Sequence, residues 1–100
     1  MKTNELSGAA LDWAVAKCEV GADFIGEIDD PHFYSTDWAL GGEIIEREKI
    51  DVWTHAGKAW AASTDKGRTE YRGTTPLIAA MRCYVASKLG DNVELPEELR

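Results

Sequence analysis

Apolar residues recur at helical spacing near both ends of the chain and predict two main helices. The first covers residues 7–20, where Ser7 can cap the start. The second opens at Thr75-Pro76, a good capping residue followed by proline at the first helical position, and stops before Gly90. Both helices carry one apolar face, so each is expected to cover a core.

Between these helices the pattern changes to the alternation of β-strands. Residues 50–54 and 59–63 alternate in polarity, and a third strand is expected at 68–72. Turn-forming residues separate them at 55–58 and 64–67. The sequence therefore predicts an α+β fold, with two main helices packed on a small two- to three-stranded antiparallel sheet.

One or two short extra helices are expected before the first strand. Ser35 or Thr36 can cap a single turn containing Trp38, and residues 43–48 predict a second short helix. Gly41-Gly42 lies between them and permits a sharp change of direction.

The remaining segments carry weaker patterns. Within residues 21–33, Phe24-Ile25 predicts a short strand and the rest an exposed acidic loop. The tail, residues 91–100, is expected to pack loosely as an extended piece with a final turn.

Composition limits the class of protein. One hundred residues with 44% hydrophobic and 29% charged content make a single domain, residues 1–100. The net charge of −7 argues against direct nucleic-acid binding. No apolar run is long enough for a membrane span or a signal peptide, so we expect a cytoplasmic protein in which Cys18 and Cys83 are free thiols.

Catalytic and metal-binding patterns are weak, and we expect neither an enzyme nor a cofactor. His32 and His55 have no evident nucleophile and orienting partner. Asp29, Asp30 and His32 are possible metal ligands, but adjacent polar residues in a loop are usually only solvated, so no metal is predicted.

Ligand binding is the favoured hypothesis, in two regions. The first includes the start of the last helix, where Arg72, Thr74 and Thr75 can hold an anion near the indole of Trp60. Trp53 and Trp60 can instead be cross-strand core partners.

The second region is a turn that presents polar side chains beside aromatic rings. Tyr34 or Trp38 can stack on a base and Asp37 can contact its polar edge. Alternatively, Trp38 fills the core while Asp37 caps the turn.

Residues 10–16, 34–39, 41–48 and 75–83 form four distinctive blocks. Together these blocks resemble the phage NinX-like family, whose members are small lambdoid phage and prophage proteins with a domain of unknown function. The resemblance implies a viral accessory protein acting inside a bacterial cell, and it supplies no catalytic residues. By analogy with other small phage proteins, it suggests a role against host immunity.

Two functional hypotheses follow. In the first, the protein sequesters a small nucleotide-type immune signal without cleaving it, as a homo-oligomer. In the second, it is an inhibitor or adaptor that blocks a host defence protein through an acidic face. That face would consist of Glu43, Glu46, Glu48, Asp51, Glu94, Glu97 and Glu98.

Overall fold

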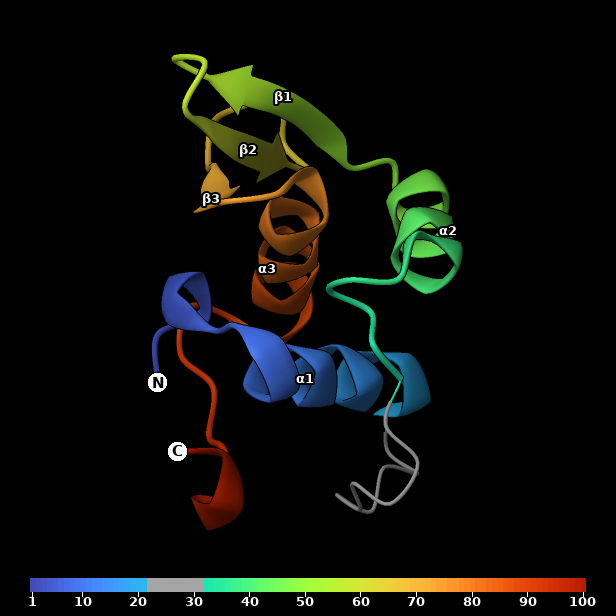
Figure 1. Ribbon diagram of the computed structural model, residues 1–100, viewed down its shortest axis with the longest axis vertical. Coiled ribbons are helices and arrows are strands. Elements are labelled where there is room, and N and C mark those ends of the chain that lie inside the picture. The colour runs from blue at the N-terminus through green and yellow to red at the C-terminus, as the bar shows by residue number, and fades with distance from the viewer. Residues whose placement is uncertain (22–31) are drawn as a thin grey trace.

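Helix α3 (Pro76–Leu89) lies at the centre of the fold. In the computed structural model, the sheet packs around the start of α3 and helix α1 (Gly8–Val20) crosses beneath its other end (Figure 1). Helix α2 (Trp38–Glu48) lies at its side. The structure describes residues 1–21 and 32–100. The predicted α+β architecture is confirmed.

The boundaries of the two main helices follow local signals. The Thr75 hydroxyl accepts the Ile78 N–H at 3.1 Å, Pro76 is the first residue of α3, and Gly90 follows its end. Ser7 precedes α1 in an extended conformation, although its side chain makes no capping hydrogen bond. Both predicted helices are confirmed to within one residue.

Helix α2 corrects the prediction of two short pieces separated by a glycine bend. It runs without interruption from Trp38 to Glu48, and Asp37 rather than Ser35 or Thr36 caps it by accepting the Ala39 N–H at 2.9 Å. Gly41 has helical geometry and serves close packing instead. A Cβ there would lie 2.5 Å from Leu77 Cδ1.

The sheet is antiparallel with strand order β1-β2-β3. The strands are β1 (Asp51–His55), β2 (Ala59–Ser63) and β3 (Tyr71–Gly73). The first two agree with the prediction to within one residue at each end.

The third strand is shorter and later than the predicted 68–72, because side-chain bonds hold the preceding loop. The Ser63 hydroxyl accepts the N–H groups of Asp65 and Gly67, at 3.1 and 2.9 Å. Asp65 Oδ1 accepts the Thr69 N–H at 2.9 Å. These hydrogen bonds hold the backbone between Ser63 and Thr69 in turns, so this segment does not pair with β2.

Strand register places the two central tryptophans on opposite faces of the sheet. Ala62 is opposite both Val52 and Tyr71, and all three belong to the core. Trp60 shares this face, two residues before Ala62, and packs against the core. Trp53 lies opposite Ala61 on the other face. The two indoles are therefore not cross-strand partners, and that alternative is wrong.

The C-terminal tail packs tightly rather than loosely. Val93 and Leu95 are each only 4% exposed, and the Val93 N–H donates to the Met1 carbonyl at 2.8 Å. The Thr3 hydroxyl donates to the Gly90 carbonyl at 2.6 Å. The termini therefore lie side by side (Figure 1), and the predicted final turn is present at Glu97–Leu99.

The predicted strand at Phe24-Ile25 and the acidic loop around it lie outside the described residues, as do Asp29 and Asp30.

Candidate functional site

The seven predicted site residues fall into two groups. One group forms the turn before α2 and the start of that helix: Tyr34, Asp37 and Trp38. The other lies on β2, on β3 and at the start of α3: Trp60, Arg72, Thr74 and Thr75.

The turn before α2 has a fixed backbone. The Phe33 carbonyl accepts the N–H groups of Thr36 and Asp37, at 3.1 and 2.7 Å. The buried Ser35 N–H donates to Asp12 Oδ1 on α1 at 2.8 Å. The rings on this turn are therefore held on a preorganised frame.

Two aromatic side chains on this frame face solvent. Trp38 is 56% exposed and Phe33 is 57% exposed. Tyr34, between them in sequence, is half-buried and packs against the core. The alternative that Trp38 fills the core is wrong, whereas its second part, that Asp37 acts as a cap, is confirmed. Phe33 was not identified from the sequence, although its position beside the predicted binding segment is a usable signal.

The exposed side of α2 continues this surface. We call the exposed residues Phe33, Thr36, Trp38, Ala39, Glu43 and Glu46 the Trp38 face. The Trp38 ring lies along Gly42, 3.5 Å from where a Cβ would stand. The face combines a large apolar ring with two carboxylates that lie five and eight residues further along α2.

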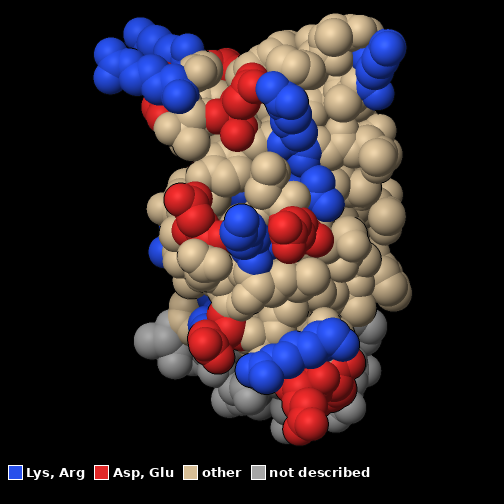
Figure 2. All heavy atoms as spheres, turned by 90° about the vertical axis from the view of Figure 1, so that its left-hand side faces the viewer, with Lys and Arg blue, Asp and Glu red and all other residues tan. Residues whose placement is uncertain are grey.

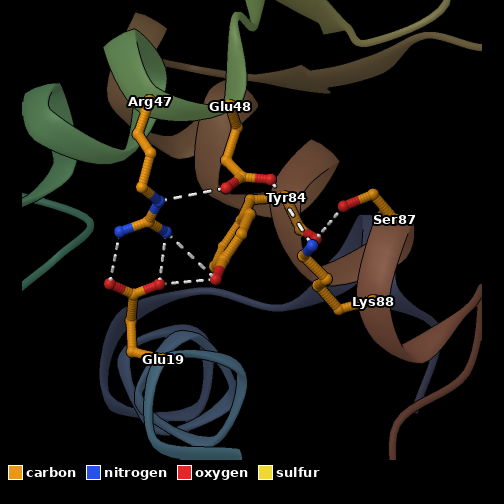
Figure 3. A network of polar contacts seen from close by, with 6 residues as sticks. All are labelled: Glu19, Arg47, Glu48, Tyr84, Ser87 and Lys88. Carbon is orange, nitrogen blue, oxygen red and sulfur yellow. Dashed lines mark hydrogen bonds and ion pairs between the residues drawn. The ribbon is translucent and has the colours of Figure 1, made fainter.

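A polar network joins the three helices behind this face (Figure 3). The Arg47 guanidinium forms two hydrogen bonds with the Glu19 carboxylate, at 2.6 and 3.0 Å. The buried Tyr84 hydroxyl donates to Glu19, and Arg47 also contacts Glu48 at 3.0 Å. The Arg47 hydrogen bonds lower the pKa of Glu19, while burial, followed by the Glu19 hydrogen bond, raises the pKa of Tyr84.

We expect acid to weaken this network. Folding lowers the pKa of the Glu19 carboxyl, so Glu19 stabilises the folded protein fully at pH values above its unfolded-state pKa of about 4.3. This stabilisation is lost as the pH falls through the pKa of Glu19 in the folded state. A Glu19→Gln variant should be less stable by about 1 kcal/mol at neutral pH, since Arg47 is partly exposed.

Thermal unfolding from neutral pH to about pH 3 measures this effect. Glu19→Gln should lose less stability than the wild-type protein over the acidic part of that range. The exposed Glu5→Gln is the matched control and should follow the wild-type curve. Equal acid slopes for Glu19→Gln and the wild type would contradict the assignment.

The start of α3 is open to solvent but offers few donors. Thr74 and Thr75 are exposed. Pro76 has no N–H, and the Ile78 N–H already donates to the Thr75 hydroxyl. Within the first turn of α3, only the Leu77 N–H is therefore left to bind an anion. Leu77 is itself 2% exposed. The start of α3 therefore offers an anion fewer free amides than the sequence suggested.

Trp60 and Arg72 are not on the same side of the sheet. Trp60 is opposite Gly73 on the core face, whereas Arg72 is opposite Ala61 on the outer face. The Arg72 guanidinium pairs with Glu70 at 2.9 Å. A pocket in which these two side chains of one chain clasp a ligand is therefore excluded.

A close contact nevertheless joins the two predicted regions. The position of a Gly41 Cβ is 2.5 Å from Leu77 Cδ1 and 2.6 Å from the Tyr34 carbonyl oxygen. The first turns of α2 and α3 therefore meet, so Trp38 and Thr75 lie at the starts of adjacent helices.

The hollows found among residues 1–21 and 32–100 are not lined by the predicted site residues. Among the described residues, one hollow of about 310 Å³ is lined by Asn4, Tyr71, Asp91 and their neighbours. Another, of about 180 Å³, lies beside Asp65 and Cys83. Neither unites the two predicted regions.

The seven described residues that were predicted to form an acidic face do not gather on one side. Glu48 pairs with Arg47 and Lys88, and Glu94 pairs with Arg100. Helix α2 and the C-terminal turn lie on opposite sides of the molecule (Figure 1), and the face shown in Figure 2 mixes acidic and basic side chains. The seven residues of the predicted acidic face therefore form separate groups.

The two cysteines are free, as expected. Cys83 is buried and Cys18 half-buried, and burial is the main cause that raises the pKa of each thiol to about 11. Neither thiol has the lowered pKa of a reactive nucleophile.

Metal ligation is not supported by the described part of the chain. There, no three His, Cys, Asp or Glu side chains gather to hold a metal ion. The candidate ligands Asp29 and Asp30 lie outside that part. No helix in residues 1–21 or 32–100 has the length and apolarity to span a bilayer.

Comparison with known proteins gives a match to a family model. No curated protein matches the chain. A family model described as "Bacteriophage P22, NinX" matches residues 2–88, a range that includes all four blocks on which the predicted resemblance rests. Because this match covers most of the sequence, the chain belongs to the phage NinX family and is a phage accessory protein.

Proposed function

We propose that this accessory protein counters bacterial immunity inside the host by docking, without catalysis, on a defence protein through the Trp38 face. The single observation that supports this proposal is the exposure of Trp38 and Phe33, 56% and 57%, on a hydrogen-bonded turn. Large aromatic side chains dominate the binding energy of protein interfaces when a partner's pocket covers them.

Charge suggests the chemistry of the partner. Glu43 and Glu46 are exposed on the same helix as Trp38, and within the described residues neither is in an ion pair. A surface that presents an apolar pocket rimmed by Lys or Arg would complement this arrangement. An anionic ligand would instead meet two like charges there.

Affinity capture from a host lysate tests the proposal. We expect the wild-type chain to retain a stoichiometric host protein that salt releases. Trp38→Ala should weaken that interaction by about 30-fold or more, because truncating a central aromatic anchor costs about 2 kcal/mol.

Val20→Ala is a matched control, since Val20 is 50% exposed on α1 and lies outside the Trp38 face. It should retain the partner at wild-type level. Recovery of the chain alone, or equal capture by Trp38→Ala, would overturn the docking proposal.

A second candidate is sequestration of a small nucleotide-type signal without cleavage. The contact of Gly41 with Leu77 favours it, because this contact brings the starts of α2 and α3 together. Tyr34 or Trp38 would stack on the base, Asp37 would contact its polar edge, and Thr74 and Thr75 would hold phosphate. In this candidate, Trp60 and Arg72 of the same chain do not both line the site between the starts of α2 and α3, because they lie on opposite faces of the sheet.

Calorimetry against cyclic di- and trinucleotides and cyclic ADP-ribose isomers tests this candidate. We expect saturable heats with the wild type, reduced by Trp38→Ala, and release of the ligand unaltered. Flat heats across the panel would remove the candidate, and release of an altered product would replace sequestration with hydrolysis.

A further inference from the structure

Strand β1 forms the open edge of the sheet, whereas the opposite edge strand is covered. On β3, the Arg72 N–H donates to Asn4 Oδ1 at 3.3 Å, and the Arg72 carbonyl accepts from the Arg82 guanidinium at 2.7 Å. Over residues 1–21 and 32–100, no such bond reaches the outer edge of β1, which is the outermost strand in Figure 1. An uncovered edge is a template for a further strand.

The hydrogen-bond pattern identifies the unpaired groups. The main-chain groups of Arg72 point away from β2, so Arg72 and Ala61 form a non-hydrogen-bonded pair. The main-chain N–H and C=O groups of Ala61 therefore point towards β1, where they form hydrogen bonds with Trp53. By alternation, Val52 and Thr54 direct their N–H and C=O groups to the open edge.

We propose that β1 pairs antiparallel with β1 of a second copy of this chain, around a two-fold axis at Trp53. In this register, Val52 of each copy exchanges both main-chain hydrogen bonds with Thr54 of the other. Both sets of unpaired groups are thereby satisfied, and the two three-stranded sheets join into one of six strands. A two-fold interface requires such a self-complementary patch.

The side chains of β1 fit this register. Trp53 lies opposite Trp53 of the second copy in a non-hydrogen-bonded pair, where side chains approach most closely. Asp51 lies opposite His55 of the second copy at both ends, where an imidazole N–H can donate a hydrogen bond to the carboxylate. All three share the outer face of the sheet, and Glu70 near His55 is already paired with Arg72.

The proposed dimer is moderate in strength. A five-residue strand ladder with one tryptophan pair buries less surface area than a standard interface, which buries roughly 800 Å² on each partner. We therefore expect a dissociation constant in the micromolar range. The proposal is independent of the docking function, since Trp38 lies on a different element.

Sedimentation velocity over a range of protein concentrations tests the pairing. We expect the wild type to change from monomer to dimer with concentration. Thr54→Pro should weaken the dimer at least about tenfold, because it removes an N–H that bonds only across the new interface. Thr54→Val keeps that N–H and should dimerise like the wild type. Thermal melts of both variants verify that the monomer is folded.

Charge exchange tests the register and does not depend on proline. Asp51→Lys places Lys opposite His55, and His55→Glu places Glu opposite Asp51, so each variant alone should dimerise several-fold more weakly than wild type. Mixed together, the two variants form one Lys–Glu and one His–Asp pair, and dimerisation should recover. A wild type that stays monomeric, a Thr54→Pro variant that dimerises normally, or a mixture without recovery would each overturn the proposal.

Discussion

Replacing Gly41 with alanine is expected to lower the free energy of unfolding by about 2–3 kcal/mol. The new Cβ would lie 2.5 Å from Leu77 Cδ1 and 2.6 Å from the Tyr34 carbonyl oxygen. Leu77 is buried and the carbonyl is backbone, so neither can yield without displacing α2 from α3. The loss corresponds to roughly 10–20 °C in melting temperature for a domain of this size.

Gly42→Ala is the matched control, because it makes the same change one position along the helix. Its Cβ would lie 3.5 Å from the nearest Trp38 atom, which is ordinary contact. Alanine favours helix over glycine, so this variant should be as stable as the wild type or more stable by up to about 1 kcal/mol. Equal melting temperatures for the two variants would show that α2 does not pack closely on α3 at Gly41.

Asp12→Ala is expected to cost about 2 kcal/mol of stability and to loosen the aromatic turn. Asp12 is 8% exposed, and its Oδ1 accepts the buried N–H of Ser35 at 2.8 Å. Removing the carboxylate leaves that N–H buried without an acceptor, which costs more than the hydrogen bond contributes. Chemical denaturation measures the loss, and faster amide exchange of Ser35 would locate it.

Asp12→Asn is the conservative counterpart, since its carbonyl oxygen can still accept the Ser35 N–H. Its cost should be less than half that of Asp12→Ala. If the two variants lose equal stability, the negative charge rather than the hydrogen bond supports the turn. If neither loses stability, the Asp12–Ser35 contact does not hold the turn in place.

The Gly41–Leu77 and Asp12–Ser35 contacts also show which features of the site the sequence does not predict. Tyr34, Asp37 and Trp38 were identified because polar and aromatic residues cluster within a few positions, which is a local signal. Their attachment to Asp12, 23 positions before Ser35, and to Leu77 depends on packing between helices. Phe33 lies directly before this cluster in the sequence, but only the folded surface shows that its ring is exposed.

Elements whose causes are local can be predicted from the amino-acid sequence. Thr75-Pro76 and Gly90 set the limits of α3, alternation identified β1 and β2, and four sequence blocks identified the family. Capping, backbone preference and side-chain periodicity act over a few residues, so they can be read without coordinates.

The way in which those elements pack together is visible in the folded protein and not in the sequence. The tertiary structure showed that Gly41 serves close packing rather than a bend, and that Trp60 and Arg72 lie on opposite faces of the sheet. It also showed that, among the described residues, β3 is covered whereas no hydrogen bond reaches the outer edge of β1. Register, face and close approach depend on contacts between residues far apart in the chain, which no local pattern encodes.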